Sequence, residues 1–268
     1  MKRNEFTIFS SCVAGIAAVA ADTRHVFSRH THEQFGVGVI GRGAQKSSSG
    51  RGMVEAGRGH TITVNPGEVH DGAPIGDAGR AWRMLYIDPP LIAQAAGDLG
   101  LGRTTDYEFA HPALANAAVA DCFVRLFVAV TRTDRGALRS EELLLTLLPM
   151  LMAARHKSDE GRAIAPGVFA AKCRIDDCPA KPITLGDLAQ IGGLSRFQLL
   201  RGFARATGLT PHAYLVQRRI DLARRLIAGG AALSEAAAAS GFADQSHMTR
   251  IFIRKYGLSP GAYAAAMA

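Results

Sequence analysis

Two stretches of twenty residues decide the fold of the C-terminal part of the chain: TLGDLAQIGGLSRFQLLRGF at residues 184–203 and LSEAAAASGFADQSHMTRIF at residues 233–252. Each stretch predicts a short helix, a turn that contains glycine, a polar N-cap residue and a longer second helix. One such pattern is a weak indication, but these two occur in the same register. Together they indicate a duplicated helix-turn-helix unit.

The second helices of the two units correspond residue by residue, with Arg201 aligned to Arg250 and Phe203 to Phe252. Residues 211–228, between the units, begin with proline and are followed by two glycines, which predicts one helix. That helix would be about 27 Å long at 1.5 Å per residue. It would hold two recognition helices near the spacing of about 34 Å between successive major grooves. One chain is therefore expected to read two neighbouring grooves of double-stranded DNA.

These residues resemble the DNA-binding domain of the AraC/XylS family of transcription regulators. The resemblance covers roughly residues 166–264, and GFADQSHMTRIFIRKYGLSPGAY at residues 241–263 looks like the family's signature. One departure is Gly202, which lies inside the first recognition helix, where glycine costs about 1 kcal/mol relative to alanine.

The charge of the chain is distributed unevenly between its two parts. The net charge is +8, and residues 166–268 hold 13 Lys and Arg against 6 Asp and Glu. Residues 1–165 hold the remaining 18 and 17. The positive charge therefore belongs mostly to the segment with the helix-turn-helix patterns, which favours a polyanionic partner for that segment.

Helical spacing separates a groove-facing side of each recognition helix from a core side, on which Leu199, Phe203, Met248 and Phe252 are expected. Ten residues are candidate DNA contacts: Phe197, Gln198, Leu200, Arg201 and Arg205 in the first unit, and Gln245, Ser246, Thr249, Arg250 and Arg254 in the second.

The type of each side chain suggests what it contacts. Arginine bridges two acceptors of guanine and glutamine pairs with adenine in the major groove, so Arg201 and Arg250 are expected to read bases. Arg205, Arg254 and Lys255 are expected on phosphates. Four arginines of the connecting helix are expected to supply a basic edge: Arg218, Arg219, Arg224 and Arg225.

Residues 24–88 predict many short strands with glycine turns, which is typical of a small barrel or jelly roll. A first strand is expected near Val13–Val19, and others at Phe35–Ile40, Met53–Glu55, His60–Val64 and Trp82–Ile87. Within this region RHTHE at 29–33 and NPGEVH at 65–70 resemble the cupin-type sensor domain that precedes AraC-type DNA-binding domains.

Five residues of this region are candidates for binding an effector. His30 and His32 share a strand face by period two, and His70 follows a Pro-Gly turn. Three such histidines would suit a divalent metal, but Gly36 and Val37 stand where the metal-binding cupin pattern needs a glutamate. We therefore expect no metal and no cofactor, and interpret the histidines as part of a small-molecule pocket or as ordinary barrel residues. Trp82 and Tyr86 share a face and are expected to wall that pocket or to fill the core.

Residues 113–130 and 141–152 predict two apolar helices, packed on the barrel or used for dimerisation, with Pro149 able to kink the second. The expected fold is thus α+β with several domains: a cupin-like β-barrel with helices over 1–156, a linker over 157–167 and an all-α DNA-binding domain over 168–268.

The remaining features favour an intracellular protein. The four cysteines form no disulfide framework, and no stretch is long and apolar enough to span a membrane. The N-terminal run to Ala21 imitates a signal peptide but is interrupted by polar residues, so a cytoplasmic location is expected.

The sequence predicts a regulator, not an enzyme, and so no catalytic residues. An N-terminal sensor would bind a small effector and the C-terminal units a promoter, as an activator that forms a homodimer and contacts RNA polymerase. Two alternatives stay open: a metal-dependent cupin enzyme fused to a DNA-binding domain, and a repressor that needs no effector.

Overall fold

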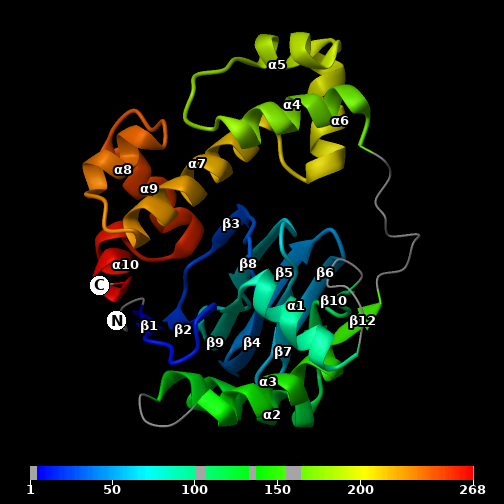
Figure 1. Ribbon diagram of the computed structural model, residues 1–268, viewed down its shortest axis with the longest axis vertical. Helices are drawn as coiled ribbons and strands as arrows, with labels where there is room; N and C mark the ends of the chain where they lie inside the picture. Colours follow the sequence, from blue (N-terminus) through cyan, green and yellow to red (C-terminus); the bar gives the residue numbers. More distant parts are fainter. Residues whose placement is uncertain (1–4, 101–106, 133–136, 155–163, 268) are drawn as a thin grey trace. The chain divides into compact units, whose positions relative to one another are not determined.

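A computed structural model describes residues 5–100, 107–132, 137–154 and 164–267. The chain divides into two compact units, residues 1–155 and 156–268. In the described residues, the first unit combines strands with three helices and the second contains helices only (Figure 1). The predicted fold class, a β-rich N-terminal domain followed by a helical domain, is confirmed.

The N-terminal unit contains antiparallel strands in two larger sheets and one small one. The six-stranded sheet has the order β1 (Glu5–Phe9), β2 (Ile16–Thr23), β9 (Arg80–Ile87), β4 (Phe35–Arg42), β7 (Thr61–Val64) and β11 (Ala113–Leu114). The four-stranded sheet has the order β3 (Phe27–His30), β8 (His70–Pro74), β5 (Ala44–Ser49) and β6 (Gly52–Gly57), and β10 (Tyr107–Phe109) pairs with β12 (Met152–Ala154). Among the described strands, the pairing gives separate sheets instead of one closed ring.

The two larger sheets face each other across an apolar core. This core takes Ile40, Trp82 and Met84 from the six-stranded sheet and Ala56 from the four-stranded sheet. Arg80, 1% exposed, crosses the same interior: its Nε donates to Gln45 Oε1 at 2.9 Å and its Nη2 to the Gly72 carbonyl at 3.3 Å. Burial lowers the pKa of this guanidinium to about 10.

The opposite face of the six-stranded sheet is covered by helices α1 (Pro89–Asp98), α2 (Ala117–Thr131) and α3 (Ala137–Leu151). Side chains alternate along β9, so that Met84 faces the other sheet while Leu85 and Ile87 face the helices. Helices α2 and α3 lie side by side there (Figure 1). The helix expected from residue 113 begins at Ala117 because Asn116 caps it, accepting from the N–H groups of Ala118 and Val119.

The C-terminal unit contains seven helices among its described residues: α4 (Pro166–Asp177), α5 (Leu185–Gly192), α6 (Arg196–Thr207), α7 (Pro211–Ala228), α8 (Leu233–Ala239), α9 (Gln245–Tyr256) and α10 (Pro260–Met267). The two predicted helix-turn-helix units correspond to α5–α6 and α8–α9, joined by α7. Pro166 and Gly167, which the sequence assigned to the linker, form the first turn of α4, and linker residues 157–163 lie outside the described residues.

Local capping explains why these helices begin and end where they do. Thr184 with Asp187 and Ser195 with Gln198 form capping boxes at the starts of α5 and α6, and Asp244 caps α9. Gly208 and Gly257 end α6 and α9 at φ of 73° and 79°, in the left-handed region that glycine adopts without strain.

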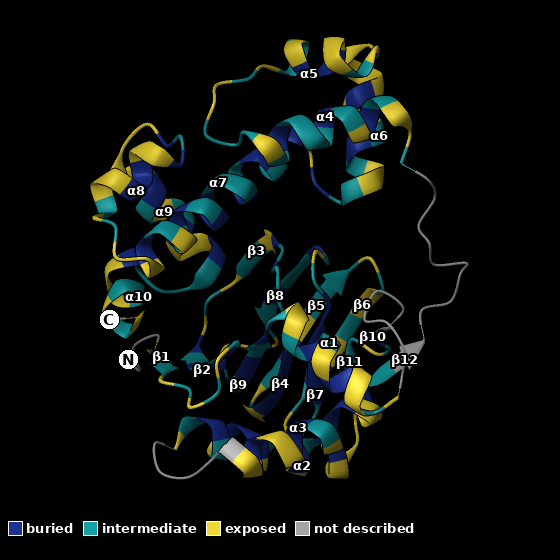
Figure 2. Cartoon of the chain, viewed as in Figure 1, coloured by how far each residue is buried: buried dark blue, intermediate teal, exposed yellow. Residues whose placement is uncertain are grey.

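Helix α7 is shared by two separate hydrophobic cores. Leu215, in its first half, packs with Leu199 and Phe203 of the first helix-turn-helix unit. Ile220 and Ile227, further along, belong to a second core with α8 and α9, which also contains Met248 and Phe252. Figure 2 shows exposed residues on the outer sides of α5 and α8, away from these cores.

Candidate nucleic-acid interface and sensor site

The two recognition helices, α6 and α9, present matching exposed faces. Leu199, Phe203, Met248 and Phe252 are fully buried, as helical spacing predicted. Nine of the ten candidate DNA contacts are exposed and the other, Thr249, is half-buried; the exposed ones are Phe197, Gln198, Leu200, Arg201, Arg205, Gln245, Ser246, Arg250 and Arg254.

Three of these side chains already make contacts within or at the start of α6. The Arg201 guanidinium lies 5.4 Å from the centre of the Phe197 ring, a cation–π contact that holds both on the outer face. The backbone N–H of Ser195 donates to Gln198 Oε1 at 2.9 Å, so the Gln198 carboxamide caps its own helix. The Gln198 side chain thus stabilises the start of α6 in addition to being a candidate DNA contact.

The structure corrects the expected phosphate contact of Lys255. Lys255 is only 7% exposed and lies on the inner side of α9. Burial lowers the pKa of its ammonium to about 8, although the nearby Asp221 carboxylate acts in the opposite direction. A buried ammonium does not reach a DNA backbone. In the last turn of α9, Arg254 is therefore the basic residue that faces outward.

Three of the four arginines expected to form a basic edge on α7 also make contacts within the C-terminal unit. Arg218 Nε lies 3.1 Å from Asp176 Oδ1, and Arg219 Nε donates to the Pro179 carbonyl at 2.8 Å. The Arg224 guanidinium lies 5.5 Å from the centre of the Tyr256 ring. These three arginines join α7 to neighbouring segments and are half-buried, and Arg225 is exposed. The basic edge therefore stays a prediction, with Arg225 as its most accessible member.

In the N-terminal unit the three candidate histidines meet. His30 and His70 are direct partners across the β3–β8 pair, and His32 follows two residues later. Their ring centroids are 4.4 Å apart for His30 and His70, 4.8 Å for His30 and His32, and 5.2 Å for His32 and His70. His30 and His32 are buried, and His70 keeps part of its surface open. Burial lowers the pKa of the His70 imidazole below its usual range.

The two aromatic candidates, Tyr86 and Trp82, lie in different surroundings. The Tyr86 ring lies 4.8 Å from the His32 ring, so Tyr86 belongs to the histidine cluster. Trp82 is buried beside Phe6 and Phe27, whose ring centroids lie 6.3 and 6.4 Å from the Trp82 ring centroid. Trp82 is thus a core residue between the sheets, which was one of its two expected roles.

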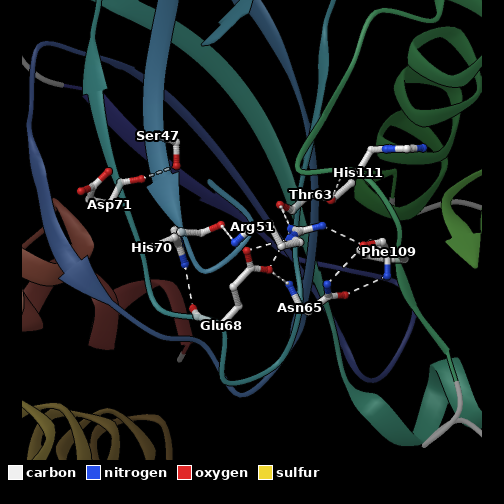
Figure 3. A network of polar contacts seen from close by, with 10 residues as sticks. Ser47, Arg51, Thr63, Asn65, Glu68, His70, Asp71, Phe109 and His111 are labelled. Carbon is white, nitrogen blue, oxygen red and sulfur yellow. Dashed lines mark hydrogen bonds and ion pairs between the residues drawn. The ribbon is translucent and has the colours of Figure 1, made fainter. Parts of the chain in front are cut away.

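A polar network that sequence reasoning missed supports the turn before His70 (Figure 3). Arg51 Nε donates to Glu68 Oε1 at 2.8 Å, and Arg51 Nη1 donates to the Phe109 carbonyl at 2.7 Å. Asn65 Oδ1 accepts from the Phe109 N–H at 2.8 Å. Burial raises the pKa of Glu68, but the hydrogen bonds from Arg51 and from the Asn65 N–H outweigh it, so the net pKa is lowered. The motif Asn65-Pro-Gly-Glu was the available signal.

The N-terminal unit also has a hollow of about 360 Å³ over the four-stranded sheet. It includes the cations Arg29 and Lys46 and the exposed apolar residues Val26 and Met53. None of the three histidines lines it.

Comparison with known proteins identifies both units. The family model of the AraC-like ligand binding domain matches residues 13–148, and that of a helix-turn-helix domain matches residues 188–266. The chain belongs to the AraC family of transcriptional regulators. It combines a ligand-binding domain with a helix-turn-helix DNA-binding domain, as the residues of both units had indicated.

Similar proteins share both units. The chain is 28% identical over 227 residues to the transcriptional regulator YbfI of Bacillus subtilis, covering 83% of this chain and 81% of the relative. It is 24% identical over 245 residues to the probable regulator LumQ of Photobacterium leiognathi, covering 90% and 93%. A crystal structure of apo ToxT from Vibrio cholerae aligns with a TM-score of 0.61 at 12% identity, over 96% of this chain and 99% of that one, which shows a shared fold.

Proposed function

We propose that this AraC-type regulator is an activator that binds promoter DNA through two adjacent major grooves and responds to a small effector. The observation that carries the proposal is the duplication of one exposed face on α6 and α9, with arginine at matching positions. NphR of Rhodococcus and RhaS of Klebsiella pneumoniae, which resemble parts of the chain at 37% and 28% identity, are named transcriptional activators.

The chemistry of the two faces assigns roles to their side chains. Arg201 and Arg250 each donate to guanine O6 and N7, and Gln245 pairs with adenine. Phe197, 66% exposed, contacts a thymine methyl group. Arg205 and Arg254, in the last turns of α6 and α9, contact phosphates.

Salt dependence tests the phosphate contacts. The logarithm of the affinity for DNA should fall linearly with the logarithm of the salt concentration, with a slope of about −0.9 for each phosphate contact. Arg205→Gln and Arg254→Gln should each lower the magnitude of this slope by the contribution of about one phosphate contact. Each should also weaken binding to all DNA sequences by a similar factor. A slope that is flat for the wild type would contradict the proposal.

The effector is proposed to bind at His30, His32, His70 and Tyr86, where three imidazoles and a phenol converge within one unit. A ToxT structure contains a bound unsaturated fatty acid, which shows that a protein of this fold takes a small ligand. A thermal-shift screen of metabolites should find a stabilising compound, and calorimetry should then show weaker binding to His32→Ala. Full affinity in His32→Ala with loss in Lys46→Ala would move the site to the hollow over the four-stranded sheet.

The proposal includes a homodimer that contacts RNA polymerase in the cytoplasm. Helices α2 and α3 cover the face of the six-stranded sheet that lies away from the four-stranded sheet, and they expose Val128, Leu138 and Met150, at 40%, 70% and 38%. Such exposed apolar residues on two adjacent helices suit a dimer interface. Sedimentation analysis should give a dimer for the wild type and a monomer for Leu138→Asp; a monomeric wild type would overturn this part.

Within the described residues, no helix is long and apolar enough to cross a membrane.

A further inference from the structure

The three histidines of the N-terminal unit form a compact donor set. Each offers one ring nitrogen, and these nitrogens all lie within 4.8 Å of one another. They come from two strands paired in register at His30 and His70, together with the short segment that holds His32. Imidazole nitrogens suit Zn²⁺, Cu²⁺, Fe²⁺ and Ni²⁺.

Two of the rings are held in a fixed orientation by backbone carbonyl groups. His30 Nδ1 lies 2.7 Å from the Ser28 carbonyl oxygen, and His70 Nδ1 lies 3.0 Å from the Glu68 carbonyl oxygen. A carbonyl oxygen only accepts, so in the neutral ring Nδ1 carries the proton and Nε2 carries the lone pair. Metal-bound histidines show this arrangement, in which the second nitrogen donates to a carbonyl or carboxylate.

The protein scaffold also restrains the segments that hold the rings. The Gly67 N–H donates to the His32 carbonyl at 2.8 Å, which joins the turn before His70 to the segment after β3. Arg51 and Glu68 hold the same turn through the network of Figure 3. A tetrahedral metal with bonds of about 2.0–2.1 Å requires nitrogens about 3.3–3.4 Å apart, so the donor set must contract from separations of up to 4.8 Å while the backbone stays in place.

We infer that His30, His32 and His70 bind a divalent transition-metal ion, with a fourth coordination position left for water or for an oxygen donor of the effector. The inference deepens the proposed effector site and rests on it for that last role. It differs from the expectation drawn from the sequence, which counted the absent glutamate near Gly36 and Val37 against a metal. Three imidazoles are a sufficient protein donor set for an ion that keeps one open position.

Metal titration of the full chain tests the inference. Protein stripped with a chelator is titrated with Co²⁺ and followed by its visible spectrum, then with Zn²⁺ as a competitor. The wild type should bind one ion, and His32→Ala and His70→Ala should each lose at least about 100-fold in affinity, more than the loss typical of a missing supporting contact. His111→Ala, whose residue is exposed and outside the cluster, is the matched control and should bind normally.

Two results would overturn the inference. One is a wild type that binds no Co²⁺ or Zn²⁺ under these conditions. The other is binding that His32→Ala and His70→Ala retain, or that shows a thiolate-to-cobalt charge-transfer band, which would place the ion on cysteines.

A second measurement covers the case in which the alanine variants do not fold. Zn²⁺ that binds only the folded state raises the melting temperature of the wild type. His32→Gln, which keeps a polar side chain of similar size, should fold and show no such rise. DNA binding measured on the same samples separates the two proposals: a wild type that binds DNA without binding metal overturns the metal site alone, and one that binds metal without binding DNA overturns the proposed function alone.

Discussion

At the scale of single residues, Lys255 shows how helical spacing decides what a charged side chain does. Its charge suggested a phosphate contact, but it lies seven residues after Met248 and three after Phe252, both fully buried, and so shares their side of α9. The periodicity of the sequence therefore contained the correct answer, and the residue type was misleading.

Lys255→Met should stabilise the C-terminal unit at pH 7. Burial lowers the pKa of Lys255 to about 8 from 10.5, so between these values the unfolded state binds more protons and stability rises with pH. Below pH 8 the full free-energy cost of burying the charged ammonium is present, on the order of 1–3 kcal/mol. The advantage of the variant should thus be largest below pH 8 and shrink toward pH 10, as measured by urea unfolding.

The exposed neighbour Arg254 is the control for this prediction. Arg254→Met removes only a secondary coulombic contribution to the lowered Lys255 pKa, so it should leave most of the pH dependence of unfolding in place. It should reduce the salt slope of DNA binding, whereas Lys255→Met should leave that slope unchanged. A salt slope that falls in Lys255→Met would return Lys255 to the DNA surface.

Much of the candidate sensor site follows from local sequence. Spacing by two predicted that His30 and His32 lie together, and their ring centroids are 4.8 Å apart, although β3 ends at His30 and His32 lies just beyond it. The Pro-Gly turn precedes His70, which pairs with His30. The support from Arg51 was not predictable, because it depends on how the β5–β6 turn meets Glu68 and the Phe109 carbonyl, which are distant in the sequence.

At the scale of elements, helices α5 to α9 of the C-terminal unit were predicted well because most of their caps are local. Thr184, Ser195 and Asp244 fix the starts of α5, α6 and α9 by contacts within three residues. Strands β5 and β8 were missed because their serines, glycine and proline do not alternate in polarity. Their pairing depends on partners elsewhere in the sheet.

Glycines explain how closely α4 and α5 approach. A Cβ on Gly192 would lie 2.5 Å from the Gly167 carbonyl oxygen, and one on Gly167 would collide with the Gly192 carbonyl. A Cβ on Gly202 would meet the Val168 side chain at 2.8 Å, which accounts for the glycine inside α6.

Gly167→Ala should therefore destabilise the C-terminal unit by about 1–3 kcal/mol or more, because backbone must move to admit the methyl group. Gly261→Ala, in α10, is the matched control: its Cβ would meet nothing within 4 Å, so the change should be neutral or stabilise by up to about 1 kcal/mol. Equal unfolding free energies for both variants would refute the close approach of α4 and α5.

At the scale of the whole molecule, the C-terminal unit has its own cores, to one of which Ile164 contributes. Residues 164–268 should therefore fold and bind DNA without the sensor unit. Circular dichroism and gel shifts on this fragment check the prediction. A folded fragment that has lost specific binding would show that the sensor unit takes part in recognition.

The central claim is that one chain reads two DNA grooves with equivalent residues of a duplicated unit. The most direct test is selection of binding sites from randomised DNA with the wild type, Arg201→Ala and Arg250→Ala. Each variant should lose preference at one patch of the site, by about 1–3 kcal/mol of discrimination, and the two patches should lie about one helical turn apart. A uniform loss of affinity in both variants, with all sequence preferences intact, would contradict the claim.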